Sequence, residues 1–345
     1  MEAGRNDPAD LCQGVMAMDL IIPDKLKKGD TVRVIAPSRS LGIVSKQVRE
    51  IATKRLNLLG LNVTFGKLVE ECDEFTSSSV SSRLSDIHEA IRDRSIAAVL
   101  TAIGGYNCNQ LLDGIDYKLF RDNPKILCGF SDITALQNAL LTKAGIVTYS
   151  GPHYSTFGME LGIEYTLEYF QKCLFSSQPF QVAQAREWSD DQWFLAQKDR
   201  KFFPNPGATV IQAGSASGRI VGGNLCTFNL LHGTEYMPNL HDSILFLEDD
   251  ELKNVYELDR DLQSVLHLPG FSGVKGLLLG RFQKKSGITP EILISIIKSK
   301  RRLSDIPIVS DCDFGHTTPQ TTFPIGGTAS MQATAGSVVV TIEQH

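Results

Sequence analysis

The sequence KILCGFSDITALQNALLTKAGIVTYS, residues 125–150, decides the fold class. Its first part, Lys125–Phe130, is a short apolar run typical of a buried strand. Ser131 and Asp132 can cap the helix that follows, which is predicted over Ile133–Lys143. Ile146–Tyr149 then starts another strand. Two strands joined by one helix indicate a parallel sheet with helical crossovers.

The same alternation of strands and helices extends outward from this stretch. Upstream, the predicted elements are strands at Thr31–Ala36, Asn62–Phe65 and Ile96–Ile103 and helices at Val44–Leu59, Val80–Arg92 and Asn107–Leu112. Downstream, they are strands at Arg219–Val221, Ser243–Leu247, Val274–Leu279, Ile306–Ser310 and Val338–Ile342 and helices at Leu225–His232, Val255–Leu266 and Pro290–Lys298. Between residues 125–150 and the downstream elements, the sequence shows neither helical nor strand periodicity. We therefore expect an α/β protein with a tail over 1–20, an N-terminal α/β domain over 21–158, a linker and substrate loop over 159–210, and a C-terminal β/α domain over 211–345.

Composition excludes several classes of protein. The chain has 345 residues, of which 34 are Lys or Arg and 39 Asp or Glu, so its net charge of −5 disfavours a nucleic acid polymer or an anionic membrane as partner. No apolar run approaches the roughly 18 residues of a membrane-spanning helix, and Met1–Cys12 lacks the features of a signal peptide, so we expect a cytoplasmic protein. Seven cysteines without a CxxC pair indicate reduced thiols and no cysteine-based zinc site.

Ser131 is a candidate nucleophile because it lies between a predicted buried strand and a predicted helix. A sharp turn at that place holds a hydroxyl above the carboxyl edge of a sheet. The motif is not a full G-x-S-x-G elbow, since Ile133 stands where the second glycine would be. The alternative is that Ser131 only caps the helix.

Two glycine pairs follow predicted strands. The amides of Gly104 and Gly105 could approach an anion or a developing oxyanion without obstruction by a Cβ atom. The alternative is a tight turn that needs positive φ, and the same alternatives hold for Gly222-Gly223-Asn224. No nucleotide-binding glycine motif accompanies either pair.

A carboxylate and a histidine also follow predicted strands. Glu248 ends the run Ile244–Leu247, although its acidic neighbours also fit a solvated loop or a metal site. His316 lies in a turn-rich loop after the strand at Ile306–Ser310, where a plain surface position is the alternative. His153, which follows Gly151-Pro152, is a secondary candidate. The chain order Ser131, Glu248, His316 is one that a Ser-His-acid hydrolase on an α/β sheet can use.

The motifs around these residues together resemble the LD-carboxypeptidase family of serine peptidases, and within it the microcin C immunity protein branch. They are Ile103-Gly104-Gly105-Tyr106-Asn107, Gly129-Phe130-Ser131-Asp132-Ile133-Thr134, Gly222-Gly223-Asn224-Leu225, Phe246-Leu247-Glu248-Asp249 and Phe314-Gly315-His316-Thr317. The resemblance extends from about residue 21 to the end of the chain. It implies a Rossmann-like N-terminal domain, a triad across the domain interface, and a homodimer.

The resemblance also assigns roles to residues. It implies Ser131 as nucleophile, His316 as general base and Glu248 as the group that orients His316. The oxyanion hole would comprise the amide of Asp132 and one amide of Gly104-Gly105. Such a triad needs no metal and no organic cofactor, and we expect none.

Substrate contacts are expected from aromatic and amide side chains, namely Trp188, Trp193, Tyr106 and Asn224. Both tryptophans lie in the aperiodic segment, where one of them, with Trp193 preferred, could stack on a nucleotide base. The alternative is that they anchor a dimer or domain interface.

Three functions remain open at this level. The first is hydrolysis of the amide between an aminoacyl or peptidyl carboxyl group and a nucleotide-like amine, which would detoxify microcin C-type peptidyl nucleotides. The second keeps the triad and removes the terminal D-alanine from murein tetrapeptides. The third is a two-domain protein that closes on a small molecule without chemistry.

Overall fold

The computed structural model describes residues 19–345. Its N-terminal half contains β1 (Thr31–Ile35), α1 (Lys46–Leu58), β2 (Asn62–Phe65), α2 (Val80–Arg92), β3 (Ile96–Thr101), α3 (Tyr117–Asp122), β4 (Ile126–Gly129), α4 (Thr134–Ala144) and β5 (Thr148–Ser150). The predicted boundaries of β2 and α2 are confirmed to the residue. The short helix predicted at Asn107–Leu112 is a 3₁₀ helix over Cys108–Gly114. The predicted tail over 1–20 lies, except for Asp19 and Leu20, outside the described residues, as does Cys12.

The second half of the chain begins with a helix. Its elements are α5 (Glu164–Leu174), β6 (Phe180–Gln181), β7 (Glu187–Trp188), β8 (Phe203–Pro204), β9 (Thr209–Gln212), β10 (Gly214–Asn224), α6 (Leu225–Asn229), β11 (Ser243–Glu248), α7 (Val255–Leu266), β12 (Gly276–Gly280), α8 (Pro290–Ser299), β13 (Ile308–Cys312), β14 (Phe323–Ile325), β15 (Thr328–Thr334) and β16 (Ser337–Gln344). The helix predicted over Val255–Leu266 is confirmed, and β10 is far longer than the strand predicted at Arg219–Val221.

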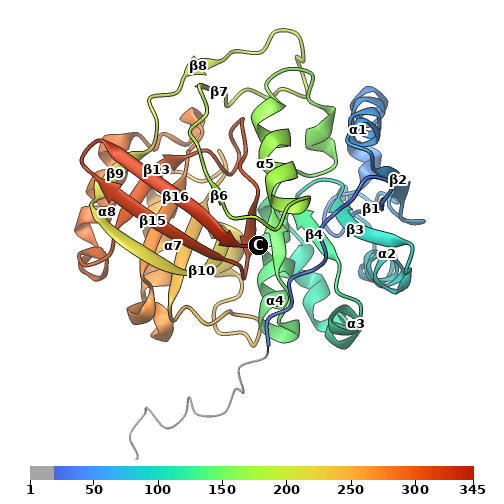
Figure 1. Ribbon diagram of the computed structural model, residues 1–345, viewed down its shortest axis with the longest axis horizontal. Coiled ribbons are helices and arrows are strands. Elements are labelled where there is room, and N and C mark those ends of the chain that lie inside the picture. The colour runs from blue at the N-terminus through green and yellow to red at the C-terminus, as the bar shows by residue number, and fades with distance from the viewer. Residues whose placement is uncertain (1–18) are drawn as a thin grey trace, which may run out of the picture.

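Two sheets organise these elements into two halves (Figure 1). The first has the order β14-β5-β4-β3-β1-β2 and is parallel except for β14, which pairs antiparallel with β5. The second has the order β6-β16-β15-β10-β11-β12-β13-β9, with β10 to β13 parallel and the outer strands antiparallel. The α/β fold class is confirmed, but the second sheet is mixed because the hairpin of β15 and β16 extends it.

Helix α4 joins the two halves, since almost every residue in it is buried. The Nδ2 atom of Asn138 donates to the carbonyl oxygen of Gly222 in β10 at 2.8 Å, and the backbone N–H of Asn224 donates to Thr134 Oγ1 at 2.9 Å. The helix ends at Gly145, which has φ +65° and the left-handed conformation of a helix cap. The helix that follows Ser131 is thereby fixed against the sheet that carries Glu248.

Helix α5 lies within 159–210, where the sequence predicts a linker and substrate loop and no helix. Its buried side chains, Thr166, Tyr169, Phe170, Cys173 and Leu174, have helical spacing, but the surrounding polar residues conceal it. Phe170 packs edge-on against Phe157, and the Tyr169 ring lies 5.9 Å from that of Phe180 in β6. Because α5 contacts both halves of the chain, part of the predicted linker is structural core.

The halves also share strands. β14 comes from the predicted C-terminal domain but forms the edge of the first sheet, where Phe323 pairs with Ser150. Phe323 also packs against Phe246 and Phe314 beneath the second sheet. The chain therefore crosses between the sheets three times, after β5, after β13 and after β14, and the crossing from β13 to β14 carries His316.

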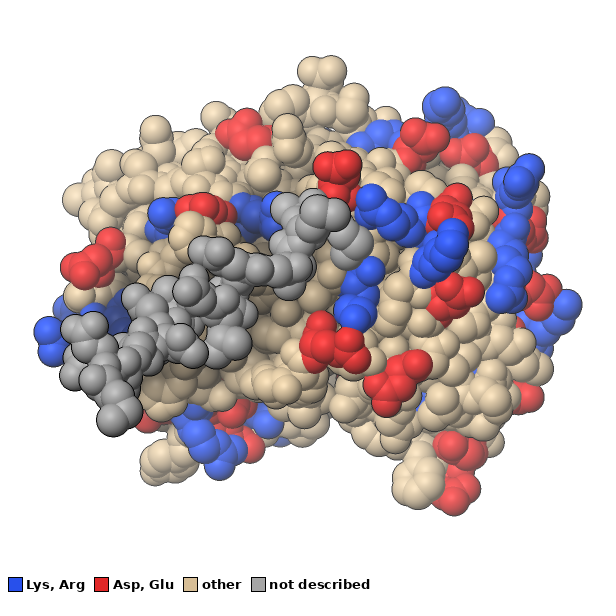
Figure 2. Space-filling view, turned by 90° about the horizontal axis from the view of Figure 1, so that it is seen from below, with Lys and Arg blue, Asp and Glu red and all other residues tan. Residues whose placement is uncertain are grey.

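The surface carries charges of both signs. On the face that Figure 2 shows, basic and acidic side chains are interspersed. Over residues 19–345, no helix combines the length and the apolar character needed to cross a bilayer.

Candidate active site

Ser131 occupies a strained turn at the end of β4. Its φ of +60° lies in the left-handed region, which residues with a side chain seldom adopt. Gly129, at the end of β4, packs directly against Thr101, since a Cβ atom on Gly129 would lie 2.1 Å from Thr101 Oγ1. Such a turn projects the hydroxyl out of the sheet edge, as a nucleophile elbow does, even though Ile133 replaces the second glycine.

Ser131, His316 and Glu248 form one hydrogen-bonded row. His316 Nε2 lies 3.0 Å from Ser131 Oγ, and His316 Nδ1 lies 2.6 Å from Glu248 Oε2. Glu248 ends β11 and is buried, with 4% of its surface exposed. Gly315, at φ +100°, lets the loop pass the carboxylate, because a Cβ atom there would lie 2.6 Å from Glu248 Oε2.

The acidic surroundings govern the charge of His316. Burial lowers its pKa, but the adjacent carboxylate of Glu248 and the nearby Asp250 and Asp249 outweigh burial and raise the pKa to about 9. The pKa of Asp249 is itself raised to about 7, mainly by burial and then by the charge of Glu248. The carboxylates around the ring therefore favour the charged form of His316, in which both ring nitrogens can donate, one to Glu248 and one to Ser131.

The Gly104-Gly105 turn lies against the serine, and the positive-φ explanation for it is wrong. Neither glycine is among those with positive φ. Glycine is required instead by close approach: a Cβ atom on Gly104 would lie 3.1 Å from Ser131 Oγ, and one on Gly105 would lie 2.2 Å from Ser38 Oγ. Both glycines line the same pocket as Ser131.

Asp132 can contribute only its backbone to the pocket. Its buried carboxylate accepts hydrogen bonds from the Ser38 hydroxyl and, at 2.9 Å, from the Cys108 amide. Burial raises the pKa of this carboxyl, and the hydrogen bonds from Ser38 and Cys108 oppose the shift. These contacts tie the serine turn to the segment that follows Gly104-Gly105, so the two turns keep a fixed separation.

Asn224 is not among the residues that line the pocket; it lies beside Glu248, 3.4 Å from Nδ2 to Oε1, so its expected contact with substrate stays a prediction. Its Nδ2 atom donates to Asp249 Oδ1 at 3.1 Å, and its Oδ1 atom caps α6 by accepting from the Thr227 amide. Gly223 has φ +121° and packs on Thr134, where a Cβ atom would lie 2.4 Å from Oγ1. The second glycine pair therefore permits close packing of α4 on β10.

The structure separates the two tryptophans. Trp193 lines the pocket together with Tyr106, whose hydroxyl donates to the carbonyl oxygen of Phe75 at 3.0 Å. Trp188 is outside the pocket lining and packs against Phe203 in β8, with the guanidinium of Arg281 5.0 Å from its ring. The expectation that Trp188 contacts substrate is thus not supported, because its ring anchors the loop.

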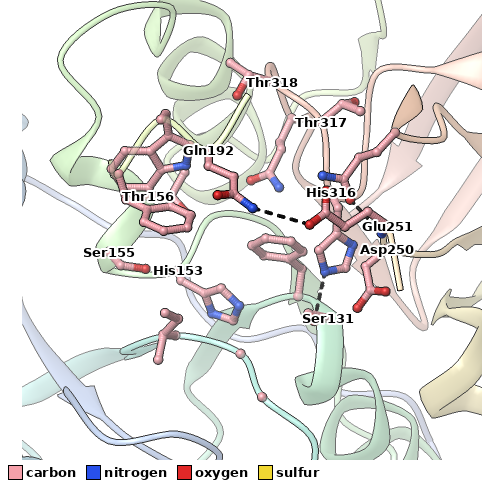
Figure 3. Close-up of a pocket in the computed structure, with 18 of the residues that line it drawn as sticks. Ser131, His153, Ser155, Thr156, Gln192, Asp250, Glu251, His316, Thr317 and Thr318 are labelled. Carbon is pink, nitrogen blue, oxygen red and sulfur yellow. Dashed lines mark hydrogen bonds between the residues drawn. The ribbon is translucent and has the colours of Figure 1, made fainter. Parts of the chain in front are cut away.

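The pocket has a volume of about 620 Å³, in the range of small-molecule sites. Figure 3 shows Ser131 and His316 next to each other in the pocket. Gln192 Nε2 donates a hydrogen bond to Glu251 Oε1 at 3.4 Å in the same pocket. Arg39, which is not among the predicted site residues, and His153, the secondary candidate, also line the pocket. Arg39 follows β1 at the carboxyl edge of the sheet, the same signal that identified Ser131.

Metal ligands do not gather in the described part of the chain, where no three His, Cys, Asp or Glu residues form a group that could hold an ion. The six cysteines within residues 19–345 form no disulfide.

Comparisons with known proteins agree with the geometry. Residues 32–151 match the model of the LD-carboxypeptidase N-terminal domain, and residues 217–331 match that of the C-terminal domain. The chain is 50% identical over 321 residues to the Bacillus subtilis protein YocD, provisionally named a carboxypeptidase, covering 93% of this chain and 99% of that one. It is 30% identical over 316 residues to the microcin C7 self-immunity protein MccF of Escherichia coli, covering 87% and 90%.

A solved structure is also similar over nearly the whole chain. The MccF-like protein of Bacillus anthracis superposes with a TM-score of 0.93 at 52% identity, covering 94% of this chain and 100% of that one. Because both family models match and the full-length fold is shared, the chain belongs to the LD-carboxypeptidase family of serine peptidases, on its MccF-like branch.

Proposed function

We propose that this protein is a serine hydrolase that cleaves the amide between an aminoacyl or peptidyl carboxyl group and a nucleotide-like amine, and so inactivates microcin C-type peptidyl nucleotides. The observation that carries the proposal is the row of Ser131, His316 and Glu248, whose serine end opens into the pocket lined by Trp193. Membership of a peptidase family supports the reaction class.

The reaction would proceed by covalent catalysis. In its neutral form, His316 takes the proton of Ser131 Oγ as the oxygen attacks the substrate carbonyl carbon, while Glu248 holds the imidazole and stabilises the resulting imidazolium. His316 then gives the proton to the leaving nitrogen as the C–N bond breaks. A water molecule, activated by the same histidine, releases the acid from the acyl-enzyme.

Backbone amides would stabilise the tetrahedral intermediates. The amide of Asp132 and one amide of Gly104-Gly105 are the proposed donors, and the contact of Gly104 with Ser131 supports this assignment. Removing one donor of this kind typically costs about 2.7–4 kcal/mol of transition-state stabilisation. The tie between Asp132 and the segment after Gly105 would keep both donors in place without reorganisation.

A nucleotide is favoured as leaving group by the aromatic wall of the pocket. Base stacking on an aromatic ring contributes about 1–3 kcal/mol, and Trp193, which lines the pocket, is the tryptophan that we expect to provide it. Among the structural relatives, MccF has been solved in complex with glutamyl sulfamoyl guanosine and with aspartyl sulfamoyl adenosine, at 27% and 26% identity to this chain.

Removal of D-alanine from murein tetrapeptides is the second candidate. It is favoured by the similarity to the murein tetrapeptide carboxypeptidase of Pseudomonas aeruginosa, which is 26% identical over 313 residues, covering 87% of this chain and 92% of that one. The triad and the oxyanion donors would serve both reactions, so the leaving group alone separates them. A binding protein without chemistry, in turn, would not need the hydrogen-bonded row.

Mass-resolved turnover of aspartyl sulfamoyl adenosine tests the proposal. The wild type should release aspartate and sulfamoyl adenosine, and Ser131→Ala, Glu248→Ala and His316→Ala should each abolish the release while remaining folded. Matched controls are Ser81→Ala and His241→Ala, which change exposed residues outside the pocket and should leave turnover unchanged. Activity on a murein tetrapeptide only would replace the first function by the second, and ligand binding without any turnover would favour the binding protein.

A further inference from the structure

His153 is a buried histidine that the proposed triad does not use. It follows β5 and Pro152, has only 3% of its surface exposed, and lines the pocket beside Ser131 (Figure 3). Its ring packs on that of Phe130 with 4.4 Å between centroids, and Phe130 in turn contacts the ring of His316. The residue is therefore held rigidly within the site.

One nitrogen of this ring is satisfied and the other is not. Nδ1 lies 2.6 Å from Thr101 Oγ1, within hydrogen-bonding distance. Nε2 is fully buried and has no hydrogen-bond partner among residues 19–345. Buried polar atoms almost always have a partner, so an unpartnered nitrogen in a pocket wall points to a group that arrives with the ligand.

The position of Nε2 indicates which part of the ligand it meets. A Cβ atom on Gly104 would lie 3.3 Å from His153 Nε2 and 3.1 Å from Ser131 Oγ. His153 Nε2 and Ser131 Oγ thus lie on the same side of Gly104, in the turn that supplies one of the proposed oxyanion donors. A carbonyl group attacked by Ser131 would bring its oxygen to this side.

The hydrogen-bond pattern gives the protonation state of the ring. Burial, followed by the nearby charges of His316 and Arg39, lowers the pKa of His153 to about 3, so the ring is neutral and carries one hydrogen. The Thr101 hydroxyl has two acceptors in reach, the Cys128 carbonyl at 3.4 Å and Nδ1 at 2.6 Å. When the hydroxyl gives its single hydrogen to the nearer acceptor, Nδ1, the ring hydrogen is on Nε2, and this is the tautomer that the inference below requires.

We propose that His153 is a third oxyanion donor, whose Nε2–H group donates a hydrogen bond to the substrate carbonyl oxygen as negative charge develops on it. This rests on the proposed function, because it requires that Ser131 attacks a carbonyl group. A neutral imidazole is suited to the role, since it donates without placing a second cation next to His316, and neutral histidines polarise carbonyl groups in other enzymes.

Two variants separate this role from packing. His153→Asn keeps an amide where Nδ1 meets Thr101 but cannot reach the position of Nε2, whereas His153→Gln can place its amide nitrogen there. We expect the Asn variant to lower kcat by about 10²–10³-fold with little change in KM, as removal of one oxyanion donor does. The Gln variant should retain kcat within about tenfold of the wild type, given that the donor is restored.

A third variant needs no change at the histidine. Thr101→Val keeps the shape of the side chain and removes the hydroxyl beside Nδ1, so it should lower kcat in a protein that still folds, with a lower melting temperature because a buried hydrogen bond is lost. It also keeps the inference testable if the Asn variant does not fold.

The outcomes separate the inference from the function on which it rests. Hydrolysis that depends on Ser131 but changes less than twofold in His153→Asn, or in Thr101→Val where the Asn variant is unfolded, overturns the inference alone. Equal losses in the Asn and Gln variants, accompanied by a lower melting temperature, would assign His153 to packing and also overturn it. If neither aspartyl sulfamoyl adenosine nor a murein tetrapeptide is hydrolysed in a Ser131-dependent way, both the proposed function and the inference fall.

Discussion

Replacement of Glu248 by glutamine should remove a pH-dependent part of the stability of this protein. The carboxylate lies 2.6 Å from His316 Nδ1 and is the main reason that the pKa of His316 is raised from 6.5 to about 9 despite burial. Since the folded-state pKa is above the unfolded value, the stabilisation is fully present below about pH 6.5 and is lost as the pH rises through about 9.

The size of this stability change can be worked out for the pH range above about 7.5. Asp249, with a pKa of about 7, is mostly ionised above pH 7.5, so His316 accounts for most of the titration near the site between pH 7.5 and pH 9.5. The 1.5 pH units between pH 7.5 and a pKa of about 9 correspond to about 2 kcal/mol at about 1.36 kcal/mol per unit. The difference in unfolding free energy between the wild type and Glu248→Gln should therefore shrink by about 2 kcal/mol between pH 7.5 and pH 9.5.

Urea denaturation of the full chain, followed by circular dichroism at both pH values, measures this difference. The control is the same substitution in a His316→Gln background, where the effect of Glu248→Gln should no longer depend on pH. A difference that stays constant within about 0.5 kcal/mol between the two pH values would show that the carboxylate does not hold a charged His316, and the reasoning would be refuted.

Three further outcomes are expected at the same site. Gly104→Ala should lower kcat/KM at least about 100-fold, because its methyl group would lie 3.1 Å from Ser131 Oγ, and retained activity in a steady-state assay would contradict the close approach. Trp193→Ala should raise KM for aspartyl sulfamoyl adenosine about 10–100-fold without changing the melting temperature. Trp188→Ala should instead lower the melting temperature and leave KM nearly unchanged. The opposite result for the two variants would show that Trp188 contacts the substrate and Trp193 anchors the loop. The pH profile of kcat/KM should rise toward a plateau above about pH 9, since only neutral His316 can accept the proton of Ser131. Asp249→Asn should move this rise to lower pH. A profile that is flat from pH 6 to 9 would refute the raised pKa of His316.

Much of the candidate site was visible in the sequence because its parts obey one local rule. Ser131, Glu248 and His316 each lie at or just after the carboxyl end of a strand, the edge at which α/β sheets keep their ligands, although Ser131 belongs to the first sheet and the other two to the second. The structure brings the three into one row over sequence separations of 185 and 68 residues. Arg39 obeys the same rule and could have been found by it.

Other assignments depended on contacts that no local pattern reveals. Asn224 and Trp188 have the residue types of ligand contacts, and the structure adds that one donates to Asp249 and the other packs under Arg281. For Gly104 and Gly105 the sequence left open a close approach of their amides or a turn with positive φ, and the structure shows neither glycine at positive φ and little space for a Cβ atom beside Ser131 and Ser38. Helix α5 was overlooked because its periodic side chains are few and are surrounded by polar ones.

The sequence by itself determined the α/β class, most strands and helices, the three residues of the row and the family, because these depend on periodicity and on motifs that are contiguous in the chain. Only the tertiary structure decided which tryptophan faces the pocket, that β14 joins the first sheet, and that His153 presents an unpartnered nitrogen beside Ser131. The physical reason is that burial, hydrogen-bond partners and pKa values arise from atoms far apart in sequence, which meet only when both sheets pack against helices α4 and α5.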